Sequence, residues 1–295
     1  MKRFEPLRGV VVPMITPLFE QDGVDLEGLC KLAGRFLSAP SVDGLFAFGA
    51  TGEFMRLTLD ERIEGIRALG SVARGGKTIV VNVGGVEKAE MVELAEVASE
   101  ARLDAVAAVV PETVEATSEG LYRYFSPLGE VGLPLIVYWT PHVKNQKPTP
   151  ELVASLMRIP TFAGTKDSSR DMESFAAICA EFGEDISVFQ GVEMLHLPSL
   201  VCGSAGVIGG GLNLYPGVLA ALTEAFGRHD LTAARQLQQE ASDNWSILNS
   251  RKSFRWICKR IWAEQGMITG TFCRESEDEP LSSPEMERIR AMIRL

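Results

Sequence analysis

The sequence has few of the residues that bind metals or anionic polymers. Histidine occurs only three times in 295 residues, at His142, His196 and His229. No grouping of histidine, cysteine and carboxylate residues has the spacing of a zinc site, so we expect no metal. Lysine and arginine total 29 against 39 acidic residues, which gives a net charge of −10. Because nucleic acids and anionic membranes are bound by clustered cations, we expect neither as a partner.

Cysteine and long apolar runs are also scarce. The five cysteines are odd in number and form no CxxC pair, which favours buried, reduced thiols over a disulfide framework. No stretch approaches eighteen uncharged apolar residues, so the sequence predicts no transmembrane helix. The N-terminal residues lack the apolar core of a signal peptide. These absences together favour a cytoplasmic protein.

One basic cluster stands out late in the chain. It is spaced through a predicted helix, and its members are Arg251, Lys252, Arg255, Lys259 and Arg260. We interpret it as a solvated helix face.

Short apolar runs alternate with amphipathic helical stretches along most of the chain. Continuous apolar strands with helices between them are typical of a parallel sheet, because both faces of each strand are buried. Eight such units over roughly 220 residues favour an α/β fold, the closed (β/α)8 TIM barrel, over an open sheet. The eight predicted strands span residues 10–15, 44–48, 78–83, 105–110, 135–138, 162–165, 186–190 and 206–208.

An open doubly wound sheet is the alternative, but its nucleotide-binding signature is absent. Gly49-Ala-Thr-Gly52 lacks the GxGxxG spacing, and Gly75-Gly-Lys-Thr78 precedes its strand where a P-loop would follow one. We therefore assign the barrel to residues 1–224. After Pro216 the pattern is helical only, so residues 225–295 are predicted to form a helical segment packed on the barrel.

Two polar-tipped side chains end consecutive predicted strands. Lys166 ends one apolar run and is followed by Asp167, Ser168 and Ser169, and Tyr138 ends the run before it. The carboxyl ends of barrel strands gather at one mouth, where barrel enzymes do their chemistry. A neutral lysine can attack a ketone to form a Schiff base, and a tyrosine can move the protons. The plain alternative is a lysine that merely caps a strand.

Two glycine-rich turns complete the candidate site. Gly49-Ala-Thr-Gly-Glu53 follows the second strand and brings backbone N–H groups close to the Thr51 hydroxyl, which suits a small carboxylate. The segment 203–211, rich in glycine, allows close approach of backbone to a ligand. An ordinary loop and tight packing at the barrel rim are the respective alternatives.

Taken together, these residues resemble the dihydrodipicolinate synthase / N-acetylneuraminate lyase superfamily of Schiff-base class I aldolases. The resemblance covers nearly the whole chain and rests on an ordered set of motifs. They are Thr16-Pro17, Gly-x-Thr-Gly-Glu53, Tyr138-x-x-Pro141, Gly164-Thr-Lys-Asp-Ser168, Gln190-Gly191, Gly203-x-x-Gly206-Val-Ile208 and Asn213.

The resemblance implies a role for each residue. Lys166 would form an imine with pyruvate or another 2-oxo acid, so that no cofactor is needed beyond this lysine. Tyr138 would transfer protons, and Thr51 with its backbone would hold the carboxylate. The remaining residues implied in substrate binding are Ala50, Gly191, Ile208 and Glu193. The resemblance also implies a homo-oligomer, either a dimer or a homotetramer.

The chain departs from the family pattern at several positions. The synthase has a second threonine where Ala50 stands, a tyrosine pair where Glu112 and Thr113 stand, and an arginine where Val143 stands. The lyase motif for a polyhydroxylated tail has lost its first acidic residue to Val192, although Glu193 remains. Trp139, beside the tyrosine, either shapes the pocket or is a core aromatic.

These features favour a lyase that reversibly cleaves a 2-oxo-3-deoxy sugar acid. A dehydratase of such acids begins from the same imine and is the nearest alternative. Activity as a 4-hydroxy-tetrahydrodipicolinate synthase is a further alternative. The last is a non-catalytic regulatory protein that binds a 2-oxo acid.

The departures generate a first prediction. Pyruvate and aspartate semialdehyde should condense slowly or not at all. The groups expected to bind the semialdehyde and to relay protons to it are replaced in this chain. Loss of a buried cationic partner typically costs about 2–5 kcal/mol, enough to remove most turnover. A coupled assay of the condensation tests this, and a rate usual for an efficient synthase would restore the synthase interpretation.

Overall fold

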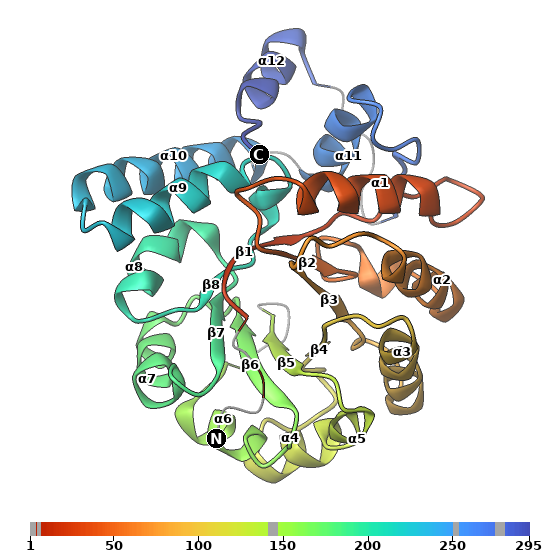
Figure 1. Cartoon of the computed structure of the whole chain (residues 1–295), viewed down its shortest axis with the longest axis vertical. Helices are drawn as coiled ribbons and strands as arrows, with labels where there is room; N and C mark the ends of the chain where they lie inside the picture. Colours follow the sequence, from red (N-terminus) through yellow and green to blue (C-terminus); the bar gives the residue numbers. More distant parts are fainter. Residues whose placement is uncertain (1–3, 5–6, 141–146, 250–253, 275–280) are drawn as a thin grey trace.

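The chain folds into a closed barrel of eight parallel strands, as a computed structural model shows for residues 4, 7–140, 147–249, 254–274 and 281–295. Each strand pairs with its sequence neighbour, and β8 returns to β1 to close the ring (Figure 1). The strands are β1 (Gly9–Pro13), β2 (Gly44–Ala47), β3 (Thr78–Asn82), β4 (Ala105–Val109), β5 (Leu135–Trp139), β6 (Phe162–Asp167), β7 (Ser187–Gln190) and β8 (Gly206–Val207). The predicted (β/α)8 barrel is therefore confirmed.

Helices follow the strands and cover the outside of the barrel (Figure 1). They are α1 (Leu26–Leu37), α2 (Leu59–Gly70), α3 (Lys88–Glu100), α4 (Ser118–Phe125), α5 (Leu128–Val131), α6 (Pro150–Leu156), α7 (Met172–Phe182), α8 (His196–Val201) and α9 (Pro216–Gly227). Local sequence sets their starts. Thr58 and Glu61 form a capping box at α2, and Thr149 followed by Pro150 begins α6.

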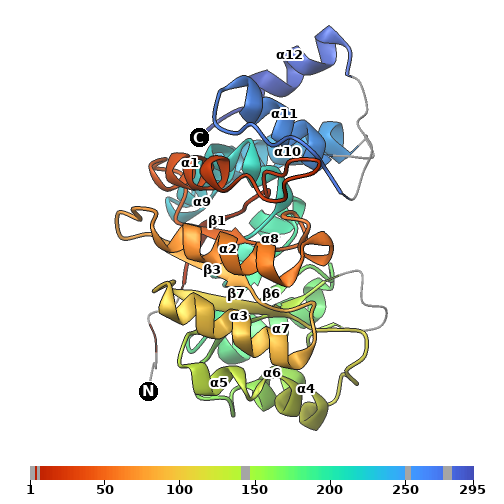
Figure 2. The ribbon, with the colours of Figure 1, turned by 90° about the vertical axis from the view of Figure 1, so that its right-hand side faces the viewer.

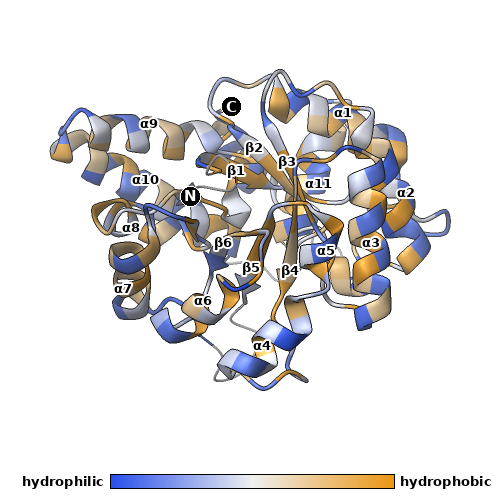
Figure 3. Ribbon diagram, turned by 60° about the horizontal axis from the view of Figure 1, so that its bottom comes forward, coloured by the Kyte–Doolittle hydropathy of each residue, from blue (hydrophilic) through white to orange (hydrophobic). Residues whose placement is uncertain are grey.

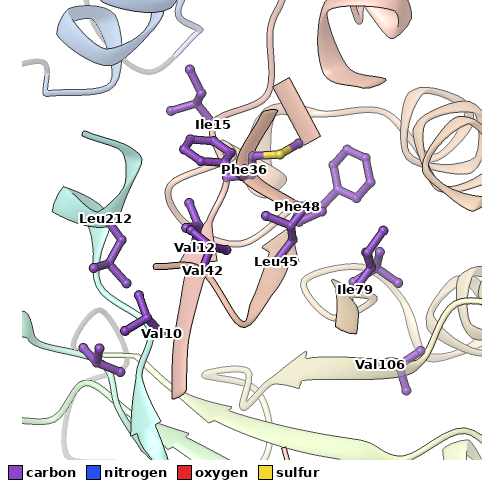
Figure 4. Close-up of a cluster of buried hydrophobic side chains, with 14 of the residues drawn as sticks. Val10, Val12, Ile15, Phe36, Val42, Leu45, Phe48, Ile79, Val106 and Leu212 are labelled. Carbon is purple, nitrogen blue, oxygen red and sulfur yellow. The ribbon is translucent and has the colours of Figure 1, made fainter. Parts of the chain in front are cut away.

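The apolar side chains form two clusters, one on each side of the strands. The larger lies between the strands and the helices, and Figure 4 shows part of it around Val12, Leu45 and Phe36. Figure 3 shows that the strands are largely apolar and that hydrophilic residues gather on the helices around them.

The inner cluster fills the barrel itself. Its members are Val11, Phe46, Phe54, Val80, Ala105, Ala107, Val109, Ile136, Tyr138, Phe189 and Ile208. Successive side chains of a strand point to opposite faces, so Tyr138 lies inside the barrel while Trp139 packs in the outer cluster. Trp139 is therefore a core aromatic. Where the strands begin, a cavity of about 20 Å³ is lined by members of the inner cluster together with the polar residues Arg8, Asp43 and Thr78.

Three helices follow α9: α10 (Leu231–Asn249), α11 (Phe254–Glu264) and α12 (Ser283–Ala291). They lie at one end of the molecule, with α11 beside α1 and α12 outermost (Figure 2). Trp262 of α11 packs its ring edge-on against Phe36 of α1, with centroids 5.2 Å apart. The predicted boundary at residue 224 falls inside α9.

Parts of the expected pattern lie outside the described residues, namely Pro141, Val143 and the tail around 275–280. Among the residues that are described, no helix is long and apolar enough to cross a membrane.

Candidate active site

Lys166 and Tyr138 face each other inside the barrel. They are direct partners in the β5–β6 register, at the carboxyl ends of both strands. The Lys166 Nζ lies 4.1 Å from the centroid of the Tyr138 ring and 4.6 Å from that of Phe46. The Phe46 and Tyr138 rings meet edge-on, with centroids 6.0 Å apart. The amine therefore has aromatic rings on two sides, and one of them carries a hydroxyl.

Burial dominates the electrostatics of Lys166. The residue is 4% exposed, and desolvation lowers the pKa of its amine from the ordinary value. The neighbouring Tyr138 and the Glu193 carboxylate act in the opposite direction and raise this pKa in part. The net lowering enlarges the neutral fraction of the amine, which is the form that attacks a carbonyl.

The turn after β2 presents unused backbone donors. Its carbonyls are engaged: Asn82 Nδ2 donates to the Phe48 oxygen over 3.0 Å, and Thr16 Oγ1 donates to the Gly52 oxygen over 2.8 Å. The Ala50 oxygen accepts from Arg255 Nε over 3.1 Å. Within the described part of the chain, the amides of Ala50, Thr51 and Gly52 have no acceptor. Thr51 and its neighbours can thus donate to an anion.

Gly191 and Ile208 lie where β7 and β8 end. The Gly191 amide donates to the Asp167 oxygen over 2.7 Å, and that of Ile208 to the Gln190 oxygen over 2.8 Å. A Cβ at Gly191 would stand 1.9 Å from Ser168 Oγ, so close packing requires glycine there. Ile208 belongs to the inner cluster. Both residues shape the mouth through packing.

Glu193 is buried and braces the loop after β8. It begins the short 3₁₀ helix η2 (Glu193–Leu195), and its Oε1 accepts from the Gly211 amide over 2.7 Å. Gly211 lies in a second 3₁₀ helix, η3 (Gly210–Asn213). Burial raises the pKa of Glu193, while Lys166 and Arg170 act to lower it. The carboxylate therefore accepts from protein backbone, and its charge acts to raise the pKa of Lys166.

Sequence reasoning missed Phe46 and misjudged Lys259 of the basic cluster. Phe46 lies against the amine, but a phenylalanine in an apolar strand carries no signal of that role. Lys259 was predicted to be solvated, and this was wrong: it is fully buried and its Nζ lies 2.6 Å from Glu53 Oε1. Trp256 and Trp262, three residues before and after Lys259 on the helix and both buried, were the available signal that this helix position faces the core.

No group of three or more metal-ligating side chains occurs among the described residues. The site thus consists of one desolvated amine, one phenol and one turn rich in amide donors.

Comparison with known proteins shows the family of the chain. The model of the dihydrodipicolinate synthetase family matches residues 6–293. The 4-hydroxy-tetrahydrodipicolinate synthase of Thermus thermophilus is 33% identical over 291 residues, covering 97% of this chain and 95% of the relative. The N-acetylneuraminate lyase of Enterobacter sp. (strain 638) is 27% identical over 290 residues, covering 98% and 96%.

Solved structures share the fold. YagE, a prophage protein of the dihydrodipicolinic acid synthase family from E. coli, was solved in complex with pyruvate. It superposes with a TM-score of 0.83 at 23% identity, over 97% of each chain.

The buried amine generates a prediction about stability. Replacing Lys166 with Met keeps the side chain's bulk and removes the desolvation cost, so the variant should melt at a higher temperature than the parent. A rise of about 2 °C is expected per kcal/mol relieved. Because the folded pKa is lowered, the cost is fully present below that pKa and fades as the pH rises toward about 10.4.

Thermal unfolding across a pH series measures this difference. The exposed Lys31, changed to Met, is the control and should give no such rise. A Lys166→Met variant no more stable than the parent at neutral pH would contradict the desolvated amine.

Proposed function

This chain belongs to the dihydrodipicolinate synthetase family of aldolases and lyases, and we propose that it cleaves or forms a 2-oxo-3-deoxy acid through an imine on Lys166. One observation carries the proposal: a single desolvated amine faces a phenol at the same register, at the carboxyl end of the barrel. A packing role alone gives no reason to bury an amine there, because burial without use only costs stability.

The reaction begins at the amine. Neutral Lys166 attacks the C2 carbonyl of the 2-oxo acid, and the resulting carbinolamine loses water when Tyr138 protonates the departing hydroxyl. This leaves a protonated imine opposite a phenolate. The imine is the electron sink on which the next step depends.

Cleavage uses the same phenolate in reverse. It takes the proton from the C4 hydroxyl as the C3–C4 bond breaks, an aldehyde departs, and the bonding electrons pass into the imine to give an enamine. The phenol then protonates C3, and water hydrolyses the imine to release pyruvate and regenerate the amine. Tyr138 thus serves as both general acid and general base.

The turn after β2 supplies a site for the carboxylate. The amides of Ala50, Thr51 and Gly52 and the Thr51 hydroxyl are donors, and bonds from such donors to an ionised acceptor are stronger than neutral ones. A carboxylate held there sets the distance from its own C2 to the Lys166 amine.

The substrate class rests on two supports. The E. coli neighbour binds pyruvate, and one relative is named a lyase. A dehydratase would start from the same imine and lose the C4 hydroxyl, so it stays the second candidate. Assembly as a dimer or tetramer and a cytoplasmic location stay predictions.

Borohydride trapping tests the imine. Incubation with pyruvate and borohydride should add a reduced pyruvyl mass to the peptide that contains Lys166, measured by mass spectrometry of a digest. Lys166→Ala should abolish the label. Labelling at another lysine, or none, would remove the mechanism.

Tyr138→Phe separates proton transfer from imine formation. The ring and its packing against Phe46 remain, but the hydroxyl is lost, so turnover should fall by roughly 10²–10⁴-fold. Trapping of Lys166 should persist, at a lower rate. Trp139→Phe, in the outer cluster, is the matched control and should affect stability more than chemistry. Near-normal turnover in Tyr138→Phe would transfer the proton role to another group, Thr51 first.

A further inference from the structure

Glu53, the last residue of the turn after β2, is held by the C-terminal segment. The residue is fully buried and has a left-handed backbone, with φ of 60°. Its Oε1 accepts from Lys259 Nζ over 2.6 Å, and its Oε2 accepts from the Arg274 amide over 2.7 Å. Lys259 also donates to the Phe272 oxygen over 2.5 Å. Residues 254–274 therefore hold the turn through hydrogen bonds and an ion pair, although Lys259 and Glu53 are 206 positions apart in the chain.

This ion pair is an expensive way to join two segments. Both side chains are 0% exposed, and removing two charges from water costs more than their attraction readily returns. A pair of apolar residues would hold α11 to the barrel as well. Unlike apolar residues, the pair fixes an orientation. A carboxylate whose two oxygens accept from fixed donors also fixes the backbone of the residue that carries it.

A second contact reaches the same turn. Arg255, one helical turn before Lys259 on α11, donates from Nε to the Ala50 oxygen. The Glu53 amide also donates to that oxygen, over 3.2 Å. The Ala50 oxygen thus accepts two hydrogen bonds, one of them from α11, and this fixes the direction of its carbonyl.

We propose that residues 254–274 are part of the active site, as a positioning device in which Lys259 and Arg255 hold the turn 49–53 so that its amides meet the substrate carboxylate. Lys259, Glu53 and Arg255 are positioning residues and touch no substrate. The inference rests on the proposed function, because it concerns the carboxylate of a 2-oxo acid bound as the Lys166 imine.

A misplaced turn and a generally destabilised protein should differ in how they bind charged and neutral ketones. Pyruvate carries the carboxylate that the amides bind, whereas methyl pyruvate offers the same ketone without the charge. Loss of the contacts from Lys259 and Arg255 should weaken the binding of pyruvate and leave the binding of the neutral ester nearly unaffected. A fault in folding or in Lys166 itself would weaken both.

The test compares borohydride trapping of Lys166 with the two probes across a concentration series. The main variant is Glu53→Gln with Lys259→Met, which removes both charges of the buried pair together. Its glutamine still offers an oxygen to the Arg274 amide. The matched control is Glu264→Gln with Arg290→Met, which removes an ion pair of 2.9 Å between α11 and the segment beyond it, away from the turn.

The half-saturating concentration of pyruvate should rise by about tenfold in the main variant and stay within about twofold in the control, the former corresponding to about 1.4 kcal/mol. The value for methyl pyruvate should change by less than about twofold in both. Arg255→Met, at a half-buried position, should shift pyruvate in the same direction by a smaller factor, and it decides the matter if the double variant does not fold.

The outcomes separate the two proposals. If the parent protein shows no label on Lys166, the proposed function fails and this inference falls with it. If the parent is labelled but folded variants keep the preference for pyruvate, or lose both probes together, the positioning role is wrong and the imine mechanism stands.

Discussion

The amine of Lys166 is a basic group held inside hydrocarbon, and the site is organised around that constraint. Burial beside Phe46 and the inner cluster penalises a charged lysine and lowers the pKa of Lys166, which shifts the equilibrium toward the neutral form that acts as the nucleophile. Tyr138 and Glu193 offset part of this cost. The surroundings of Lys166 must meet two requirements. They must bury the amine enough to lower its pKa, and they must keep enough polar groups nearby to stabilise the charge of a protonated imine.

Much of this could be predicted because parallel strands share a direction. Once Lys166 and Tyr138 were placed at strand ends, the barrel brought them into one mouth, and the register then made them direct partners. The alternation of apolar strands and amphipathic helices is a local property, so the barrel followed from it. Which side chains of each strand point into the barrel did not follow from this local pattern. For this reason Phe46 was missed as the ring beside the amine.

The contacts of the C-terminal segment could not be predicted in this way. Lys259 and Glu53 are 206 residues apart, and nothing local to either identifies its partner. A basic residue on a helix is usually solvated, which is why the prediction for Lys259 failed. Glu193 likewise accepts from the Gly211 amide, 18 residues away, a contact that its sequence position did not indicate; its role in substrate binding stays a prediction. Long-range polar pairs are fixed by the complete fold.

The departures from the family pattern change how protons can travel. Ala50 places a methyl group against the inner cluster, at the position where the synthase pattern has a hydroxyl. Glu112 and Thr113, in place of a tyrosine pair, are exposed on the loop after β4. Ala50 therefore has no side-chain proton to exchange with Tyr138, and the exposed Glu112 and Thr113 supply no buried phenol for the synthase route. Under the proposed mechanism, Tyr138 must exchange its proton with the substrate itself. That requirement favours 2-oxo acids with a hydroxyl at C4, because this hydroxyl can both donate the proton and depart as the aldehyde oxygen.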